Sequence, residues 1–128
     1  MKKMTDIEQQ QWRDYLSQES YNYAITITER DSDGAGSVYL SALQTLERIV
    51  AADPTAKAVI VISAAEQDHA HAHGVLKTSL PQRGVRSCSK GCWIHTQELY
   101  DAVGWYDYML RQGASQATLT TEELHRKP

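Results

Sequence analysis

Three of the five histidines in the chain occur in one short segment, where they alternate with small residues. The segment, residues 68–76, reads Asp-His-Ala-His-Ala-His-Gly-Val-Leu. Alternate side chains of an extended strand share a face, so this spacing would place His69, His71 and His73 together. Imidazoles on a core face would leave ring nitrogens without partners. The alternation therefore predicts a metal-binding strand.

A tyrosine near the C-terminus supplies a second reactive group. The apolar stripe of a helix is formed at helical spacing by Leu99, Val103, Tyr106 and Leu110. Tyr108 then lies about 200° around the helix axis from Tyr106, away from the core. Arg111 follows Tyr108 by one helical turn and shares its side. An exposed tyrosine beside a cation and a metal platform is the arrangement that a metal-assisted tyrosine nucleophile needs.

The elements that must position these groups follow in order along the chain. We expect a polar lead-in helix within residues 1–20, a strand at 21–29, a helix at 37–52, a strand at 57–63, the histidine strand, a strand at 92–98 and the tyrosine helix at 99–112. Residues 114–128 are predicted to be a weakly structured tail. This order predicts an α+β fold, with an antiparallel sheet of about four to five strands and helices packed on one face. The open face would carry the active site.

Composition limits the class of protein. With 128 residues, of which 41% are hydrophobic and 23% charged, the chain is expected to be one globular domain over residues 1–128. A net charge of −3 argues against indiscriminate coating of nucleic acid. The longest apolar run is far too short to span a bilayer and no signal peptide is evident, so we expect an intracellular protein without a membrane partner, in the cytoplasm or in a host nucleus. The oligomeric state stays open.

A basic segment follows the histidine strand. Residues 77–90 contain no acidic side chain and four cations, which are Lys77, Arg83, Arg86 and Lys90. Such a cluster is expected to contact a phosphate backbone through electrostatic, sequence-independent interactions.

The two motifs together resemble those of the HUH endonucleases. His71-Ala72-His73 followed by apolar residues, and Tyr108-x-x-Arg111-x-Gly113, are most similar to the Rep nuclease domains that initiate rolling-circle replication of small circular viruses and plasmids. The strand at 23–28 fits the first motif of that family in position and character. The resemblance covers residues 21–113 and implies the RRM-like sheet layout of these enzymes.

What the resemblance implies is metal-dependent nicking and joining of single-stranded DNA at an origin, commonly a hairpin. His71 and His73 would hold Mg²⁺ or Mn²⁺, and Tyr108 would attack the scissile phosphate to form a 5′-phosphotyrosine link and a free 3′-hydroxyl. Arg111 stands where the family has a lysine. Because arginine cannot accept a proton, this position is restricted to electrostatics or phosphate positioning.

The third metal ligand departs from the family pattern. The corresponding position, eight residues before His71, is Ser63, and a serine hydroxyl is a poor ligand for a hard divalent cation. Glu66 is the preferred replacement, with Asp68 and His69 as alternatives. If His69 is not a ligand, we expect it to contact DNA.

Other functions fit parts of the same pattern. A non-catalytic RRM-like module would explain the sheet and the basic segment, but it requires stacking aromatics on the open strands, where the first strand offers Ala24, Thr26 and Thr28. A metal hydrolase would use the histidines with water and form no covalent intermediate. Transposases and relaxases of the HUH type share the tyrosine chemistry.

Overall fold

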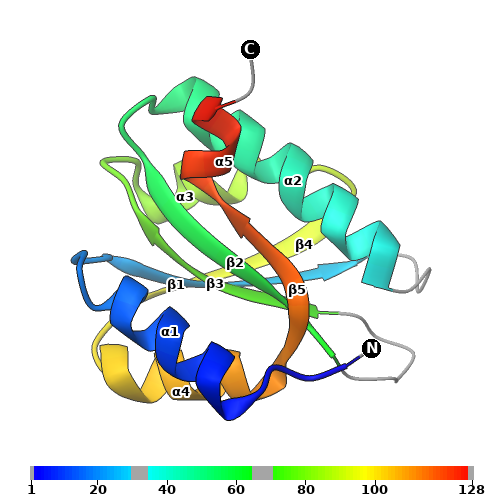
Figure 1. Ribbon diagram of the computed structural model, residues 1–128. Helices are drawn as coiled ribbons and strands as arrows, with labels where there is room; N and C mark the ends of the chain where they lie inside the picture. The colour runs from blue at the N-terminus through cyan, green and yellow to red at the C-terminus, as the bar shows by residue number, and fades with distance from the viewer. Residues whose placement is uncertain (1, 30–34, 65–70, 127–128) are drawn as a thin grey trace.

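The structure, a computed structural model, describes residues 2–29, 35–64 and 71–126 (Figure 1). The elements, in chain order, are α1 (Asp6–Leu16), β1 (Tyr23–Glu29), α2 (Ala35–Ala52), β2 (Lys57–Ser63), β3 (His71–Lys77), α3 (Gln82–Arg86), β4 (Cys92–Glu98), α4 (Ala102–Gln112), β5 (Gly113–Thr120) and α5 (Thr121–Arg126). Among the helices in these described ranges, none combines the length and the apolar character needed to cross a membrane.

The strands form one five-stranded antiparallel sheet in the order β4-β1-β3-β2-β5. The predicted α+β class is therefore confirmed. The segment from β1 to β4 follows the β-α-β-β-α-β order of the ferredoxin-like fold. The histidine strand β3 is the central strand of the sheet, and β4 and β5 are its two edges.

The first face of the sheet is covered by α2, α3 and α5, and Figure 1 shows α2 and α5 on one side of the sheet. Ile25, Ile60 and Leu76 project from the strands into this core. Leu46 of α2 and Val85 of α3 pack against them, and both are fully buried. This layer corresponds to the predicted helical layer.

The second face, which carries the histidines, is partly covered by α1 and α4. Val59 and Val61 of β2 and Val75 of β3 are buried there against Met109 of α4 and the end of α1. A strand that is apolar on both faces, as β2 is, signals burial on both sides. Helices therefore lie on both faces of the sheet, and on the second face the exposed side chains of β4 remain outside the helical layer.

The C-terminal residues differ most from the prediction. Most of the predicted tail, residues 114–128, is ordered as β5 and α5, which together span residues 113–126, and β5 pairs with β2. A glycine that follows a helix often adopts a left-handed conformation. Gly113 does not, because its backbone is extended (φ −75°, ψ 143°) and begins β5. A Cβ at Gly113 would lie 2.5 Å from Cγ1 of Val61, so the close approach of the start of β5 to β2 requires glycine.

Smaller differences concern helix boundaries. The lead-in helix is confirmed as α1, which begins at the capping box formed by Thr5 and Glu8. The basic segment, expected to be a loop, contains the short helix α3. The tyrosine helix begins three residues later than predicted, because the carboxylate of Asp101 caps it by accepting from the backbone N–H of Gly104.

Helix α4 crosses the second face from one edge of the sheet to the other. It follows the edge strand β4 and leads into β5 at the opposite edge. At its end the backbone carbonyl of Gln112 accepts from the N–H of Ala64, which follows β2. Near its start the indole Nε1 of Trp105 donates to the carbonyl of Gly74 on β3 (2.9 Å). The middle of α4 therefore lies over the central strand.

Candidate active site

His71 and His73 project side by side from β3 onto the second face, as the alternation predicted. Their rings are nearly parallel, with centroids 6.1 Å apart and an interplanar angle of 12°. His73 is buried, with 8% of its surface exposed, whereas His71 is half-buried. Thr26, the cross-strand partner of His73 on β1, places its Oγ1 3.3 Å from Nδ1 of His73.

The environment of His73 keeps its imidazole neutral. Burial, and to a smaller extent the nearby His71, lower the pKa of His73 to about 4. A neutral imidazole retains the lone pair that a metal ion requires. Metal-binding histidines usually have their second ring nitrogen held by a hydrogen-bond partner. Thr26 occupies that position at Nδ1, which leaves Nε2 as the nitrogen for a ligand.

Two aromatic side chains of α4 pack against His73. The Tyr108 ring lies 5.2 Å from the His73 ring at an interplanar angle of 70°, and the Trp105 ring lies 5.7 Å away at 88°. Trp105 also stacks on Tyr108, with centroids 5.5 Å apart. Tyr108 nevertheless keeps 41% of its surface exposed. The tyrosine predicted as nucleophile therefore touches the histidine pair and remains accessible.

Two other tyrosines close to Tyr108 in the sequence, Tyr106 and Tyr100, lie in different surroundings. Tyr106 is buried in the core between α4 and the sheet, as predicted, and burial raises the pKa of its hydroxyl. Tyr100 lies before α4 with 87% of its surface exposed. Its hydroxyl donates to the carboxylate of Glu98, and this hydrogen bond raises the pKa of Tyr100.

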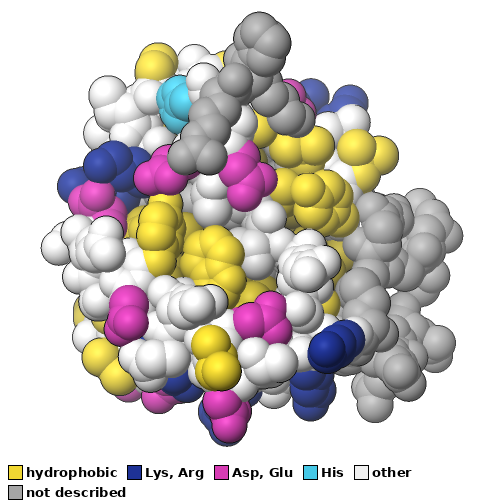
Figure 2. Space-filling view, viewed as in Figure 1, with side chains coloured by type: hydrophobic (Ala, Val, Ile, Leu, Met, Phe, Trp, Pro, Cys, Tyr) yellow, Lys and Arg dark blue, Asp and Glu magenta, His cyan; other side chains and the backbone are white. Residues whose placement is uncertain are grey.

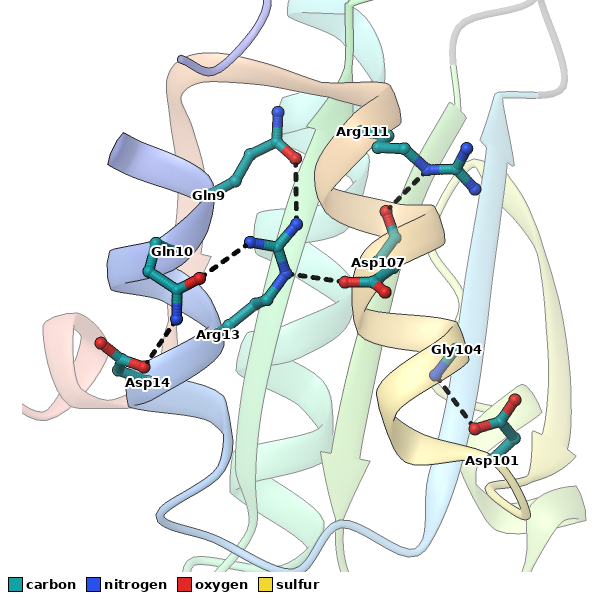
Figure 3. A network of polar contacts seen from close by, with 8 residues as sticks. All are labelled: Gln9, Gln10, Arg13, Asp14, Asp101, Gly104, Asp107 and Arg111. Carbon is teal, nitrogen blue, oxygen red and sulfur yellow. Dashed lines mark hydrogen bonds and ion pairs between the residues drawn. The ribbon is translucent and has the colours of Figure 1, made fainter. Parts of the chain in front are cut away.

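Arg111 lies one turn beyond Tyr108, as predicted, and its side chain is exposed. Its Nε donates to the backbone carbonyl of Asp107 (3.3 Å). The carboxylate of Asp107 pairs with Arg13 of α1, with Nε and Oδ1 2.6 Å apart. Figure 3 shows Arg13 reaching Asp107 from α1, while the guanidinium of Arg111 points away from α1. This ion pair neutralises the carboxylate next to Tyr108 and ties the two helices together.

The histidines supply two of the ligands that a divalent cation would need. Glu66 and His69, together with the alternative Asp68, lie outside the described residues. Within the part of the chain that the structure describes, no three His, Cys, Asp or Glu side chains gather closely enough to hold a metal ion. Ser63 is buried at the end of β2, where strand alternation puts it on the histidine face with Val61. The two imidazoles supply nitrogen ligands only, so a site for Mn²⁺ or Mg²⁺ here would require oxygen ligands in addition to them.

The predicted phosphate-contacting cations do not gather around Tyr108. Lys77, at the other end of β3 from His71, pairs with Glu19 (2.7 Å). Arg83 and Arg86 belong to α3, on the first face, and Arg86 donates to the hydroxyl of Thr96. Lys90 is exposed between α3 and β4. The cationic side chain that the structure places near Tyr108 is Arg111.

Sequence reasoning missed three contributors to this site. Arg13 and Asp107 are far apart in the chain, and no local pattern signals their pairing. Trp93 is 62% exposed on the open part of the second face. The sequence signal for Trp93 was weak, because Cys92, Trp93 and Ile94 are all apolar, and the structure alone places Cys92 and Ile94 with the core and Trp93 outside it.

A pocket of about 540 Å³ lies away from this site. It is lined by α1, the start of β2 and α5, and includes Tyr15, Glu19, Tyr21, Lys57 and Glu122. Figure 2 shows hydrophobic side chains at the centre of the face bordered by α1 and α5, with acidic side chains around them. Lys57 is paired with Glu19. The margin of this pocket therefore carries charges of both signs.

Comparison with known proteins places the chain by its fold. No family model matches it, and no curated protein matches it in sequence. The structure is similar to that of the hypothetical protein ORF119 from Sulfolobus islandicus rod-shaped virus 1, with a TM-score of 0.57. The similarity covers 80% of this chain and 91% of that chain at 18% sequence identity. At this identity the likeness concerns the fold alone.

Proposed function

We propose that the protein is a metal-dependent endonuclease of the HUH type, similar to Rep initiators, which nicks and rejoins single-stranded DNA through Tyr108. The observation that carries this proposal is the contact between the rings of Tyr108 and His73, with centroids 5.2 Å apart. This contact joins a helix and a strand that are distant in the chain, and it combines an accessible phenol with the buried imidazole of His73, which lies beside His71.

The reaction is a phosphoryl transfer. The phenolic oxygen of Tyr108 attacks the scissile phosphorus, a bond from phosphorus to the tyrosine forms, and the bond to the 3′-oxygen breaks. The phenolic proton passes to solvent, and the 3′-oxygen takes up a proton to become a free 3′-hydroxyl. The 5′-phosphate stays on the tyrosine. Attack by a 3′-hydroxyl on this link restores a phosphodiester bond and frees Tyr108.

The surrounding residues prepare the tyrosine and the phosphate. His71 and His73 would hold the cation, which when bound neutralises charge on the phosphate. Stacking against Trp105 fixes the orientation of the Tyr108 ring. Arg111 offers a positive charge one turn away, and Arg13 removes the opposing charge of Asp107.

A covalent adduct tests the proposal. Protein is incubated with Mn²⁺ and a pool of random single-stranded DNA labelled at the 3′ end, and denaturing electrophoresis then separates free from protein-linked label. We expect a labelled band that survives denaturation and disappears in Tyr108→Phe. Chelation of the metal with EDTA should also abolish it.

The matched control is Tyr100→Phe, which removes the hydroxyl of another surface tyrosine and should retain the adduct. Tyr106→Phe should retain it as well, because that hydroxyl is buried. A Tyr108→Phe protein that still forms the adduct contradicts the assignment. Cleavage without an adduct in the unmodified protein would favour water as the nucleophile.

One observation favours a second candidate, a nucleic-acid-binding module without catalysis. Such a module needs an aromatic side chain on the open strands, and Trp93 of β4 provides one. Binding of single-stranded DNA with no adduct in the presence of Mn²⁺ would select this candidate.

A further inference from the structure

Edge strand β4 presents an alternating row of exposed side chains. Cys92 and Thr96 turn toward the first face and are buried, whereas Trp93, His95 and Gln97 are exposed on the second face. These three positions extend over about 14 Å of strand. The row offers an indole, an imidazole and an amide, which are side chains that contact nucleobases by stacking and hydrogen bonding.

The strand register connects this row to the histidine pair. Thr28 of β1 is paired with Trp93 on one side and with His71 on the other. Thr26 is likewise paired with His95 and with His73. Trp93 and His95 therefore each lie two strands from a histidine, about 10 Å away, whereas Gln97 lies across from Val75. The β1 side chains between them are short, so they do not rise between the row and the histidines.

A pocket links the far end of the row to the tyrosine. It has a volume of about 330 Å³, and its lining includes Gln97, Tyr100 and Trp105. Trp105 also stacks on Tyr108. The row, the pocket and the nucleophile are thus continuous on one face of the molecule.

The charged side chains on this face favour one orientation of the phosphates and bases of a bound nucleotide. The row itself carries no acidic side chain, and the exposed Arg111 lies on the α4 side with Tyr108. Glu98, which accepts from Tyr100, and Asp101, which caps α4, place the carboxylates at the Gln97 end of the row and not beside Arg111. A single strand with its phosphates toward α4 and its bases toward β4 matches this division.

We propose that Trp93, His95 and Gln97 form the base-contacting row for the single-stranded DNA that reaches Tyr108, with Trp93 as the stacking platform. This inference rests on the proposed function for its substrate class and adds the residues that hold the strand. Exposed apolar side chains on a protein surface are common, but the registration of Trp93 with His71 through Thr28 distinguishes this one.

Binding without chemistry tests the row. Fluorescence anisotropy measures the affinity for a fluorescein-labelled oligothymidine of about 20 nucleotides in EDTA. We expect Trp93→Ala to weaken binding about 10-fold, because one stacked base is lost. Trp93→Phe keeps a ring for stacking and should stay within about twofold of the unmodified protein. Since phosphate contacts are unchanged, the salt dependence of binding should be the same in all three proteins.

The control is Tyr39→Ala, which removes an exposed aromatic side chain of α2 on the first face and should leave the affinity unchanged. Unaltered binding by Trp93→Ala, a failure of Trp93→Phe to restore it, or no binding by the unmodified protein overturns the proposal. The adduct assay separates this result from the proposed function. An adduct with no effect of Trp93→Ala on binding refutes the row alone, and Trp93-dependent binding with no adduct refutes the tyrosine chemistry alone.

Discussion

At the level of single residues, the candidate site depends on His73, which is buried beside no charged partner among the residues that the structure describes. His73 has a lowered pKa because the sheet, Trp105 and Tyr108 enclose it. Its polar contact in the described structure is the hydroxyl of Thr26, at Nδ1. The orientation of the imidazole toward a metal is therefore set by one neutral hydrogen bond from the neighbouring strand.

The first prediction concerns this hydrogen bond. Thr26→Val keeps the shape of the side chain but removes its hydroxyl, so the His73 ring loses the contact that fixes its tautomer. We expect the affinity for Mn²⁺, measured by isothermal titration calorimetry, to fall at least about 10-fold. Thr28→Val, on the same strand and face, should retain the affinity. Equal metal binding by Thr26→Val and the unmodified protein would contradict this role.

The reactive residues of the site could be predicted because each obeys a short period. His71 and His73 follow the two-residue period of a strand, and Tyr108 is opposite the apolar stripe of its helix. Their supporting residues follow no such period. Thr26 and Arg13 reach the site through strand pairing and helix packing, and contacts of this kind become visible only in three dimensions.

At the level of elements, the close approach of β2 and β3 depends on Gly74. A Cβ at this position would lie 2.6 Å from the backbone oxygen of Val59 and 3.0 Å from Cγ1 of Ile60. The carbonyl of Gly74 also accepts the hydrogen bond from Trp105. One glycine therefore fixes both the spacing of the two central strands and the attachment of α4 to β3.

The second prediction compares two glycines. Gly74→Ala should lower the free energy of unfolding by about 1–3 kcal/mol, because the strands must separate to accept the methyl group. Gly84→Ala is the matched control, since the nearest atom to its Cβ is 3.4 Å away and it lies within α3. Alanine favours helix, so this change should be neutral or stabilise by up to about 1 kcal/mol. Urea denaturation measures both, and wild-type stability in Gly74→Ala would refute the steric argument.

The elements that sequence predicted well are those with strong local patterns. The bounds of β2 and β4 agree with the prediction, because Val and Ile dominate one strand and the other alternates. The polar strand β5 has a weak pattern of its own and forms by pairing with β2. Coverage of the second face by α1 was also not predicted, because it depends on contacts such as that of Arg13 with Asp107.

For the molecule as a whole, Asp53 connects the end of α2 to the segment after β3. Its carboxylate accepts hydrogen bonds from the hydroxyls of Thr78 (2.6 Å) and Thr55 (2.7 Å) and from the backbone N–H of Ser79 (3.1 Å). These hydrogen bonds hold the pKa of Asp53 well below its usual range, and the hydrogen bond from Thr78 is the largest cause. Protonation of this side chain would loosen the junction on which β3 depends.

The third prediction follows from the sign of this shift. Because the unfolded chain binds the proton more readily than the folded protein, the stabilisation by Asp53 is present above the unfolded pKa of about 4 and is lost as the pH falls below it. Asp53→Asn should lower stability at pH 7 and reduce the further loss on acidification. Urea denaturation at neutral and acidic pH measures this, with Asp14→Asn on the exposed side of α1 as control. An acid sensitivity in Asp53→Asn equal to that of the unmodified protein would contradict the prediction.

Helix α4 connects the two edge strands of the sheet, and this connection has a consequence for the order of folding. One end of this helix is fixed where β4 joins one edge of the sheet, and the other where β5 joins the opposite edge. Contacts between distant parts of a chain form late, because closing long loops costs entropy. We therefore expect the contact of Tyr108 with His73 to form late, once both ends of α4 are fixed. A nascent or partly folded chain would carry its histidines and its tyrosine apart, and the candidate site would be assembled together with the completed sheet.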